Sequence, residues 1–269
     1  MVELNIDEIK KIQLDILKNI DKYCRNNDLK YFLAYGSLIG AIRHKGYIPW
    51  DDDIDIVMLR SDFEKFIKGF NKYNDKYMVK YCENDERFPY FFAKVEDKTT
   101  KVVENVYYKY ELGINVDIFI LDNVGDDVNN AYVLTEKMMP YKKLLKCKNI
   151  FPNSVKKRSF PKNIIVSYMK RKANRYSIAE ITKPVVSIGK TYENTESKYV
   201  AVICCVSDGY KYVFEKTKFE KTIDLPFEDM MAMVPECYDE ILTTWFGDYM
   251  KLPPEEQQVT HHDYKAYMK

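Results

Sequence analysis

Residues 31–58 read YFLAYGSLIGAIRHKGYIPWDDDIDIVM. This stretch decides the fold, and the rest of the chain extends it. Its first residues, 31–34, form a short apolar run that is typical of a buried strand. Ser37 follows closely and is the expected N-cap of a helix over residues 38–44. Residues 53–58 then alternate between polar and apolar side chains, which predicts a second strand.

The turn between the first strand and the helix has groups that suit a phosphate. A helix N-terminus presents backbone N–H groups without intrahelical partners and carries a partial positive charge. Gly36 lets the backbone approach a ligand closely, and Ser37 adds a hydroxyl. Most Gly-Ser turns are only turns, however, so this interpretation depends on what the next strand supplies.

The next strand supplies carboxylates. Because side chains alternate along a strand, Asp53 and Asp55 should point to one face, about 6–7 Å apart. Asp117 lies in a third expected strand, residues 114–121, where an unpaired carboxylate is costly to bury. Carboxylate oxygens bind Mg²⁺ together with substrate phosphates, so the pattern predicts a site for two divalent cations, Mg²⁺ or Mn²⁺. The alternative is a solvated acidic loop and an ion-paired Asp117.

The remaining pattern predicts an α/β (α+β) protein with a small mixed sheet in its first half and a helix-rich second half. Apolar residues recur every three or four positions over residues 6–26, and Ser61 can cap a further helix. The other expected strands lie at residues 77–82, 91–96, 199–206 and 210–214. We expect residues 1–125 to form the catalytic core. Residues 126–269 should pack on it and complete the site, either as a second unit or within one continuous domain.

Composition favours a folded protein of the cell interior. The chain has 269 residues, of which 46% are hydrophobic and 31% charged, and no apolar run reaches the roughly 18 residues that span a membrane. The first residues carry charges every few positions and lack the apolar stretch of a secretion signal. The six cysteines form no CxxC pair. We therefore expect reduced cysteines and a cytoplasmic location.

Charge is unevenly distributed along the chain. Residues 137–179 contain 13 Lys and Arg and no Asp or Glu, which leaves the rest of the chain with a net charge of −12. The basic part, residues 137–175, predicts a surface for a polyanion or for the inner face of the plasma membrane. The alternative is a solvated helical face whose acidic partners come from elsewhere in the fold. No recognised nucleic-acid module accompanies the basic residues, so we expect no nucleic-acid partner.

Gly36-Ser37, an Asp-x-Asp on the next strand and a third Asp on a later strand resemble the nucleotidyltransferase superfamily. The fuller string GSLIGAIRHKGYIPWDDDIDI, residues 36–56, resembles the LicD family, which includes the fukutin-type polyol-phosphate transferases. Similar segments are AKVEDKTT (93–100), INVDIFILD (114–122), LPFEDM (225–230) and FGDYMKLPPEEQQVTHH (246–262). The resemblance covers nearly the whole chain and is thinnest between about residues 126 and 218.

This resemblance implies a nucleotidyltransferase-like core and a metal-dependent transfer of a phospho-alcohol from a cytidine diphosphate donor to a glycan hydroxyl, with release of CMP. Phosphocholine from CDP-choline is the favoured unit, and teichoic acid or lipopolysaccharide precursors, lipid-linked or anionic, are the favoured acceptors. Asp53, Asp55 and Asp117 would then hold the two Mg²⁺ ions. Gly36 and Ser37 would position a phosphate, and Asp117 would accept the proton of the attacking hydroxyl.

Further residues near these motifs are candidates for the site. They are Arg43 and Lys45 for the diphosphate, Lys94 for a phosphate, and His44, Trp50, Asp52, Asp97 and His261 for other contacts. Arg43 and Lys45 are equally consistent with solvated cations at a helix C-terminus. Trp50, with Tyr47, would suit an aromatic cage for a quaternary ammonium, or would only pack its loop onto the core. His261 would reach the site from the C-terminal segment, or lie in a surface tail.

Two other functions remain open at this point. One is true nucleotidyl transfer, in which the nucleotide stays on the acceptor and pyrophosphate leaves. The other is a catalytically inactive nucleotide-binding module. The sequence also leaves choline, ethanolamine, glycerol and ribitol as alternative alcohols, since all would meet the same metal site.

Overall fold

The computed structural model describes residues 1–151, 156–204, 209–260 and 264–269. Its main sheet has the strand order β2 (Phe32–Leu33), β3 (Asp55–Leu59), β7 (Asn115–Gly125), β5 (Ala93–Asp97) and β4 (Tyr77–Lys80). Strands β3 and β7 are parallel, whereas the other neighbours on this path are antiparallel. The far end of β7 also pairs with β8 (Tyr199–Ala201), which pairs with β9 (Val213–Glu215). The predicted mixed sheet and α/β class are therefore confirmed.

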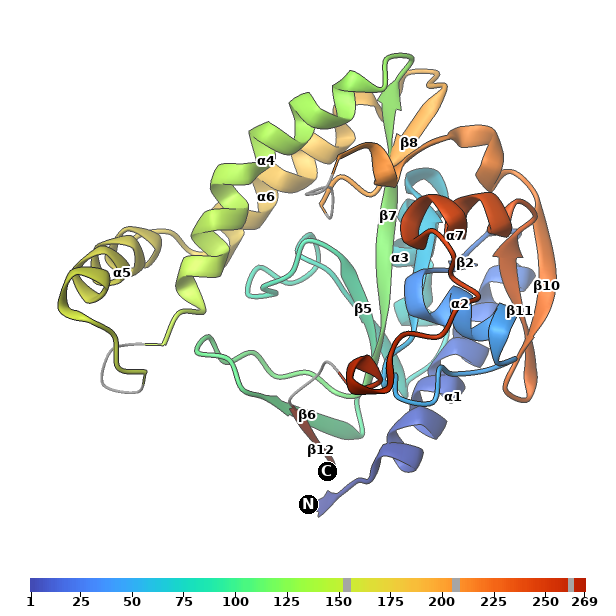
Figure 1. The fold of residues 1–269 in the computed structure, drawn as a ribbon, viewed down its shortest axis with the longest axis horizontal. Helices are drawn as coiled ribbons and strands as arrows, with labels where there is room; N and C mark the ends of the chain where they lie inside the picture. The colour runs from blue at the N-terminus through green and yellow to red at the C-terminus, as the bar shows by residue number, and fades with distance from the viewer. Residues whose placement is uncertain (152–155, 205–208, 261–263) are drawn as a thin grey trace.

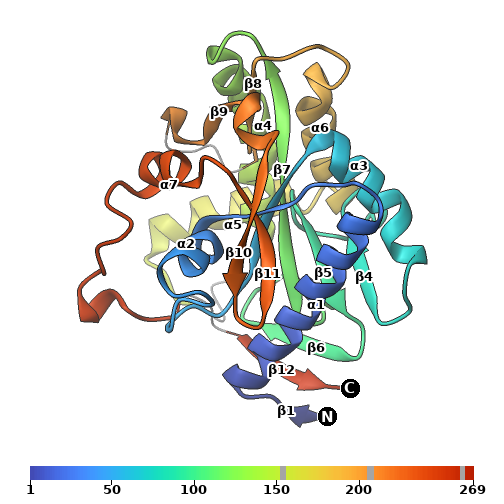
Figure 2. The same ribbon diagram turned by 90° about the vertical axis from the view of Figure 1, so that its right-hand side faces the viewer.

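Helices α1 (Ile6–Asn26) and α3 (Arg60–Gly69) cover one face of this sheet (Figure 2). The predicted helix over residues 6–26 is confirmed, and it begins with a capping box in which Asn5 and Glu8 bond to each other's backbone N–H. Its apolar side buries Ile16, Leu17 and Ile20 completely. Helix α3 begins two residues earlier than expected, with Leu59 rather than Ser61 at the N-cap.

The opposite face of the sheet is partly open, and this face carries the candidate site. Along β7, Val116, Ile118 and Ile120 are buried, whereas the residues that alternate with them are only half-buried. Those residues are Asn115, Asp117 and Phe119. Because side chains alternate along a strand, one side of β7 contributes to the core and the other presents polar and aromatic groups.

The second half is helix-rich, as expected. Helices α4 (Asn129–Lys148) and α6 (Ile178–Gly189) lie side by side near the β8 end of β7, and α5 (Phe160–Ala173) lies at the outer end of this pair (Figure 1). Leu134 and Met138 of α4 pack with Val185 of α6 in a small apolar cluster. Among the described residues, no helix combines the length and apolar character needed to cross a bilayer. A domain division near residue 125 stays a prediction.

Several strands were not expected from the sequence. β10 (Thr222–Phe227) and β11 (Met230–Pro235) form a hairpin, and β6 (Thr100–Glu104) pairs with β12 (Tyr264–Met268), which pairs with β1 (Val2–Glu3). The second sheet therefore brings the two ends of the chain together (Figure 1). The pairing of β1, β12 and β6 joins segments that are distant in sequence, so the periodicity of a single segment does not predict it.

The remaining helices are short and connect these elements. The last α-helix is α7 (Tyr238–Phe246), which packs against α2 (Tyr35–Arg43). The 3₁₀ helices are η1 (Phe70–Lys72), η2 (Lys190–Tyr192), η3 (Gly209–Tyr212), η4 (Lys216–Phe219) and η5 (Glu255–Gln257). Of the strand expected at residues 199–206, only the first three residues form β8, and residues 205 to 208 lie outside the described part. The strand expected at residues 210–214 forms later, as β9 at residues 213–215.

Candidate metal and phosphate site

Helix α2 joins the predicted phosphate turn to the carboxylate strand. It begins at Tyr35 with Ala34 at the N-cap, so the expectation that Ser37 caps the helix is wrong. Ser37 lies inside the first turn, where its buried Oγ accepts a hydrogen bond of 2.9 Å from the backbone N–H of Asp55. The hydroxyl thus fixes the start of β3 against the N-terminus of α2. Its role towards a phosphate stays a prediction.

Three predicted residues form one row across the sheet. Asp55 of β3 is the register partner of Asp117 of β7, and Asp117 is the register partner of Lys94 of β5. Neighbouring strands lie about 4.8 Å apart, and register partners present their side chains to the same face. Two carboxylates and one ammonium from distant parts of the sequence therefore meet on the open side of the sheet.

Asp53 joins this row from the segment before β3. The strand begins at Asp55, so Asp53 precedes it rather than lying within it as expected. Asp53 and Asp117 nevertheless line one pocket together. Burial, followed by the charges of Asp53 and Asp117, raises the pKa of Asp55 well above the usual value for an aspartate. The three carboxylates are therefore close enough for their charges to interact.

Lys94 is the cation of this cluster. Its Nζ donates to Asp117 Oδ1 at 2.5 Å and to Asn115 Oδ1 at 3.1 Å. The same Nζ lies 5.0 Å from the ring centre of Tyr90 and 5.2 Å from that of Phe92. Lys94 was expected to bind a phosphate, and its described contacts instead hold Asp117 in place. A contact with a donor phosphate stays a prediction.

The donor set fits divalent cations. Its ligands are carboxylate oxygens, which are the ligands that Mg²⁺ and Mn²⁺ prefer. Carboxylate oxygens of Asp51, Asp52 and Asp53 also lie within 4.8 Å of one another beside the row. One lysine cannot balance so many acids, and the pKa of Asp55 is raised first by burial and then by the charges of Asp53 and Asp117. Asp53, Asp55 and Asp117 would hold the ions.

The pocket that contains Asp53 and Asp117 also has walls that the sequence did not reveal. Glu104 comes from β6, Tyr264 from β12 and Gln13 from α1. Gln13 Nε2 donates to the backbone carbonyl of Asp52 at 3.0 Å, which joins α1 to the acidic segment. No local pattern marks these residues, because each reaches the pocket only through tertiary packing.

Gly36 is required here because it has no side chain, and not because of its backbone dihedral angles. A Cβ atom at Gly36 would lie 2.4 Å from Asp51 Oδ2, so the glycine lets this carboxylate approach the start of α2. The positive φ that the turn requires occurs at Tyr35 instead, at 46°. A non-glycine residue in this region is unusual and often marks a functional site.

The basic residues at the end of α2 and directly after it are Arg43, His44 and Lys45. Arg43 Nη1 donates to the carbonyl of Tyr249 at 2.7 Å, and Arg43 Nε donates to His44 Nε2 at 2.9 Å. Burial and the neighbouring Arg43 charge lower the pKa of His44. Lys45 is exposed in a turn with a φ of 60°. Arg43 therefore positions the segment after α7, and a diphosphate clamp by Arg43 or Lys45 stays a prediction.

The other candidates divide between a neighbouring pocket and the far side of β5. Trp50 and Asp52 line a second pocket with Tyr264 and Thr260. Asp97 is not brought to the carboxylates, because its buried side chain accepts from the Thr99 backbone N–H and pairs with Lys76 at 3.2 Å. His261 lies outside the described residues.

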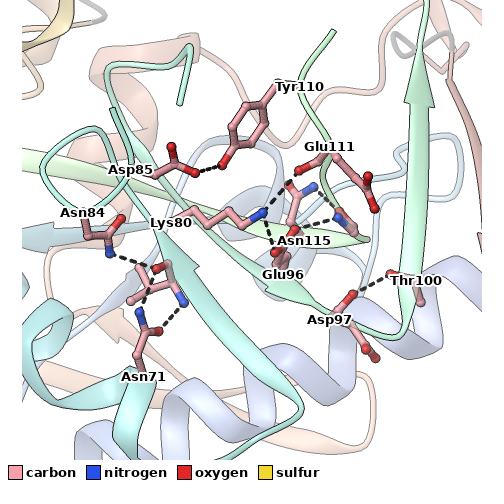
Figure 3. A network of polar contacts seen from close by, with 12 residues as sticks. Asn71, Lys80, Asn84, Asp85, Glu96, Asp97, Thr100, Tyr110, Glu111 and Asn115 are labelled. Carbon is pink, nitrogen blue, oxygen red and sulfur yellow. Dashed lines mark hydrogen bonds and ion pairs between the residues drawn. The ribbon is translucent and has the colours of Figure 1, made fainter. Parts of the chain in front are cut away.

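A polar network beneath the site fixes the start of β7 (Figure 3). Lys80 pairs with Glu96 at 2.8 Å, and Glu96 accepts the backbone N–H of Gly113 at 2.7 Å. Thr100 Oγ1 donates to the carbonyl of Asp97 and accepts the N–H of Ile114. These bonds hold the residues that lead into Asp117.

Aromatic side chains lie next to the carboxylates, and the sequence alone did not predict them. Phe119 follows Asp117 by two positions on the open face of β7, and its ring lies 4.6 Å from that of Phe92 and 5.2 Å from that of Tyr35. We call Tyr35, Phe92 and Phe119 the aromatic wall. The expected cage residue Tyr47 is instead buried, with its hydroxyl bonded to the carbonyl of Lys10 at 3.0 Å.

Comparison with known proteins identifies the family of this chain. A sequence model described as LicD/FKTN/FKRP, nucleotidyltransferase domain, matches residues 28–162. The chain is 31% identical over 272 residues to the lipopolysaccharide cholinephosphotransferase LicD of Haemophilus influenzae, with 100% of both chains covered. It is also 32% identical over 151 residues to an uncharacterized protein of Rickettsia typhi, covering 47% of this chain and 48% of that protein. By its full-length similarity and by the family match across its carboxylate motif, the chain belongs to the LicD family.

Proposed function

We propose that this protein is a metal-dependent transferase that moves phosphocholine from CDP-choline to a hydroxyl of a cell-surface glycan precursor. The acceptor oxygen attacks the phosphorus that carries choline, the diphosphate P–O bond breaks, and CMP leaves. The observation that carries the proposal is the alignment of Asp55 with Asp117, with Asp53 in the same pocket. The full-length relative is named a lipopolysaccharide cholinephosphotransferase, which supports the substrate classes.

Two Mg²⁺ ions, when bound, would neutralise the donor diphosphate and the charge that develops on the leaving CMP. Asp53, Asp55 and Asp117 would hold them. The N-terminus of α2, with its backbone N–H groups beside Ser37, lies against β3 and would bind a phosphate oxygen. We assign proton acceptance from the attacking hydroxyl to Asp117, whose orientation Lys94 fixes through a 2.5 Å contact.

The aromatic wall favours choline among the candidate alcohols. A quaternary ammonium cannot donate hydrogen bonds and is held by the faces of aromatic rings, each worth roughly 0.5–2 kcal/mol. Phe119 and Asp117 are two positions apart on one face of β7, a separation of about 6–7 Å. This separation suits a phosphate at the carboxylates and a trimethylammonium at the wall. Glycerol and ribitol would gain little from these rings.

A donor screen tests the proposal. The purified protein is incubated with Mg²⁺, a glycan acceptor and, in turn, CDP-choline, CDP-ethanolamine, CDP-glycerol and CDP-ribitol, and CMP release is followed. We expect the fastest release from CDP-choline and none with EDTA. Pyrophosphate release from a nucleoside triphosphate would instead identify a nucleotidyltransferase. Mg²⁺-dependent nucleotide binding without turnover of any donor would identify an inactive binding module.

A further inference from the structure

Helix α5 exposes an apolar stripe that no part of the described chain covers. Phe160 is 79% exposed, Ile165 60% and Tyr168 68%. The other members of the stripe are Ile164 and Met169. At 100° per residue these five positions fall within one half of the helix surface, which also carries Arg171 and Lys172. Two of the five, Tyr168 and Met169, also line a cavity next to α4. Soluble proteins rarely expose such a row without a partner.

The same part of the chain concentrates positive charge. Its 13 Lys and Arg lie among residues 137–179, which contain no acidic residue. Setting Arg158 aside, the ion pairs found among the described residues include none of these cations. Lys148 interacts electrostatically with Glu180, the first acidic residue after the segment, so an acidic partner from outside the segment compensates part of this charge. An apolar stripe beside many cations with few acidic partners suits a helix that lies on an anionic membrane surface.

A cavity of about 640 Å³ between α4 and α5 adds to this surface. Tyr168, Tyr176 and Lys172 line it on one side, and Tyr141 and Lys143 on the other. Tyrosine and lysine have an apolar body with a polar tip, and such side chains settle at the headgroup level of a bilayer.

The arm formed by α4 and α5 also touches the segment that leads to the site. Lys170 lies over the ring of Tyr107, and Asn149 Oδ1 accepts the backbone N–H of Tyr108 at 3.2 Å. This segment follows Glu104, which lines the pocket with Asp53 and Asp117. A lipid surface against α5 would therefore lie on the side of the molecule from which this segment extends to the carboxylates.

We propose that α5 docks the protein peripherally on an anionic lipid surface, with Phe160, Ile164, Ile165, Tyr168 and Met169 entering the interface and the surrounding Lys and Arg contacting headgroup phosphates. The docking extends the proposed function, because a lipid-linked acceptor would be met at that surface. It does not depend on the chemistry at the carboxylates.

The test measures sedimentation with vesicles in the absence of donor and metal. One set of vesicles is pure phosphatidylcholine, and the other contains about one-third phosphatidylglycerol. We expect binding to the anionic vesicles only, weakening steeply with salt as the Debye length falls from about 10 Å at 0.1 M to about 3 Å at 1 M. Each basic residue near an anionic surface strengthens binding about five-fold, so the triple variant K162Q/R171Q/K172Q should bind about a hundred-fold more weakly.

One further variant tests the contribution of the apolar stripe to vesicle binding, and another serves as a control. I164Q/I165Q/Y168Q removes the apolar stripe and should weaken binding at every salt concentration. K65Q/K68Q/K72Q removes three exposed cations near α3 and should bind like the unmodified protein. Equal binding to both vesicle types, or an equal loss in the α3 control, would overturn the proposal.

The outcome is distinguishable from that of the proposed function. CMP release from CDP-choline with a soluble glycan acceptor should be unchanged in both α5 variants. If the protein ignores anionic vesicles but releases CMP, the docking surface is wrong and the proposed function stands. If it binds the vesicles but turns over no donor, the docking surface stands and the proposed function is wrong.

Discussion

Asp55 and Asp117 are register partners on the neighbouring parallel strands β3 and β7, so two carboxylates from distant parts of the sequence lie on the same face of the sheet. Lys94 occupies the next position in the same row. Such a row is costly in a metal-free protein, because like charges repel and burial disfavours ionised groups. That cost makes the site testable through stability as well as through activity.

Replacing Asp55 by Asn should separate activity from stability. Asn removes a charge whose pKa is raised by burial and by the Asp53 and Asp117 charges, so the metal-free variant should melt at the same temperature as the parent or higher. Transfer activity should fall by about 1,000-fold or more, because a metal ligand is lost. Mg²⁺ should raise the melting temperature of the parent and not of D55N. Equal stabilisation of both by Mg²⁺ would remove Asp55 from the metal site.

The metal-free protein should become less stable as pH rises through the raised pKa of Asp55. A carboxyl whose folded pKa lies above its unfolded value contributes stability that is fully present below about pH 3.9 and is lost as it ionises in the folded state. Mg²⁺ competes with the proton, so its stabilising effect should grow over the same range. Denaturant titrations with EDTA and with Mg²⁺ measure both trends. An Mg²⁺ effect independent of pH would contradict this account.

Replacing Lys94 by Gln is a small change in the side chain, but it should lower kcat strongly. The substitution removes the 2.5 Å contact that orients Asp117, and we expect a fall of about 10²-fold in kcat. Lys76 is the matched control, because it pairs with Asp97 on the other side of β5, and K76Q should stay within about three-fold of the parent. Steady-state rates with CDP-choline measure the difference. A K94Q enzyme with parental kcat would show that Asp117 needs no such partner.

Phe119→Leu should reduce preference for choline and leave the chemistry intact. Losing one ring face should lower kcat/KM for CDP-choline by about 3- to 30-fold, with little change for CDP-glycerol. Trp50→Leu is the control, since Trp50 lines a different pocket, and it should leave the ratio of the two donors unchanged. Competition assays with both donors give this ratio directly. A parallel loss for both donors in F119L would indicate packing rather than recognition.

Asp122→Asn should destabilise the fold without a direct effect on the site. Arg60 and Asp122 form a buried pair at 2.7 Å between α3 and β7, and removing one partner leaves the other charge buried, at a cost of about 3–5 kcal/mol. Glu236→Gln breaks the exposed Lys221–Glu236 pair and should cost less than about 1 kcal/mol. Chemical denaturation compares the two. Equal losses of unfolding free energy in D122N and E236Q would mean that the buried pair is solvated.

The predictable part of the fold depends on local chemistry. The helix over residues 6–26 follows from apolar spacing and from the Asn5–Glu8 capping box, both set within a few residues. The alternation around Asp117 likewise identifies β7. Ser37 shows the limit of local reasoning. It looks like an N-cap, yet the chain starts the helix at Tyr35 and uses the hydroxyl to hold the backbone of Asp55.

The candidate site divides in the same way. The sequence by itself predicted an α/β core and a strand position for Asp55 and for Asp117, because residue type and strand periodicity are encoded locally, whereas Asp53 lies before β3. Only the tertiary structure decided that Lys94 pairs with Asp117, that Glu104 and Tyr264 close the pocket, and that Tyr35, Phe92 and Phe119 stand beside it. These neighbours are set by strand register and by the pairing of β6 with β12. Such long-range contacts form only when the whole core packs, and no short segment records them.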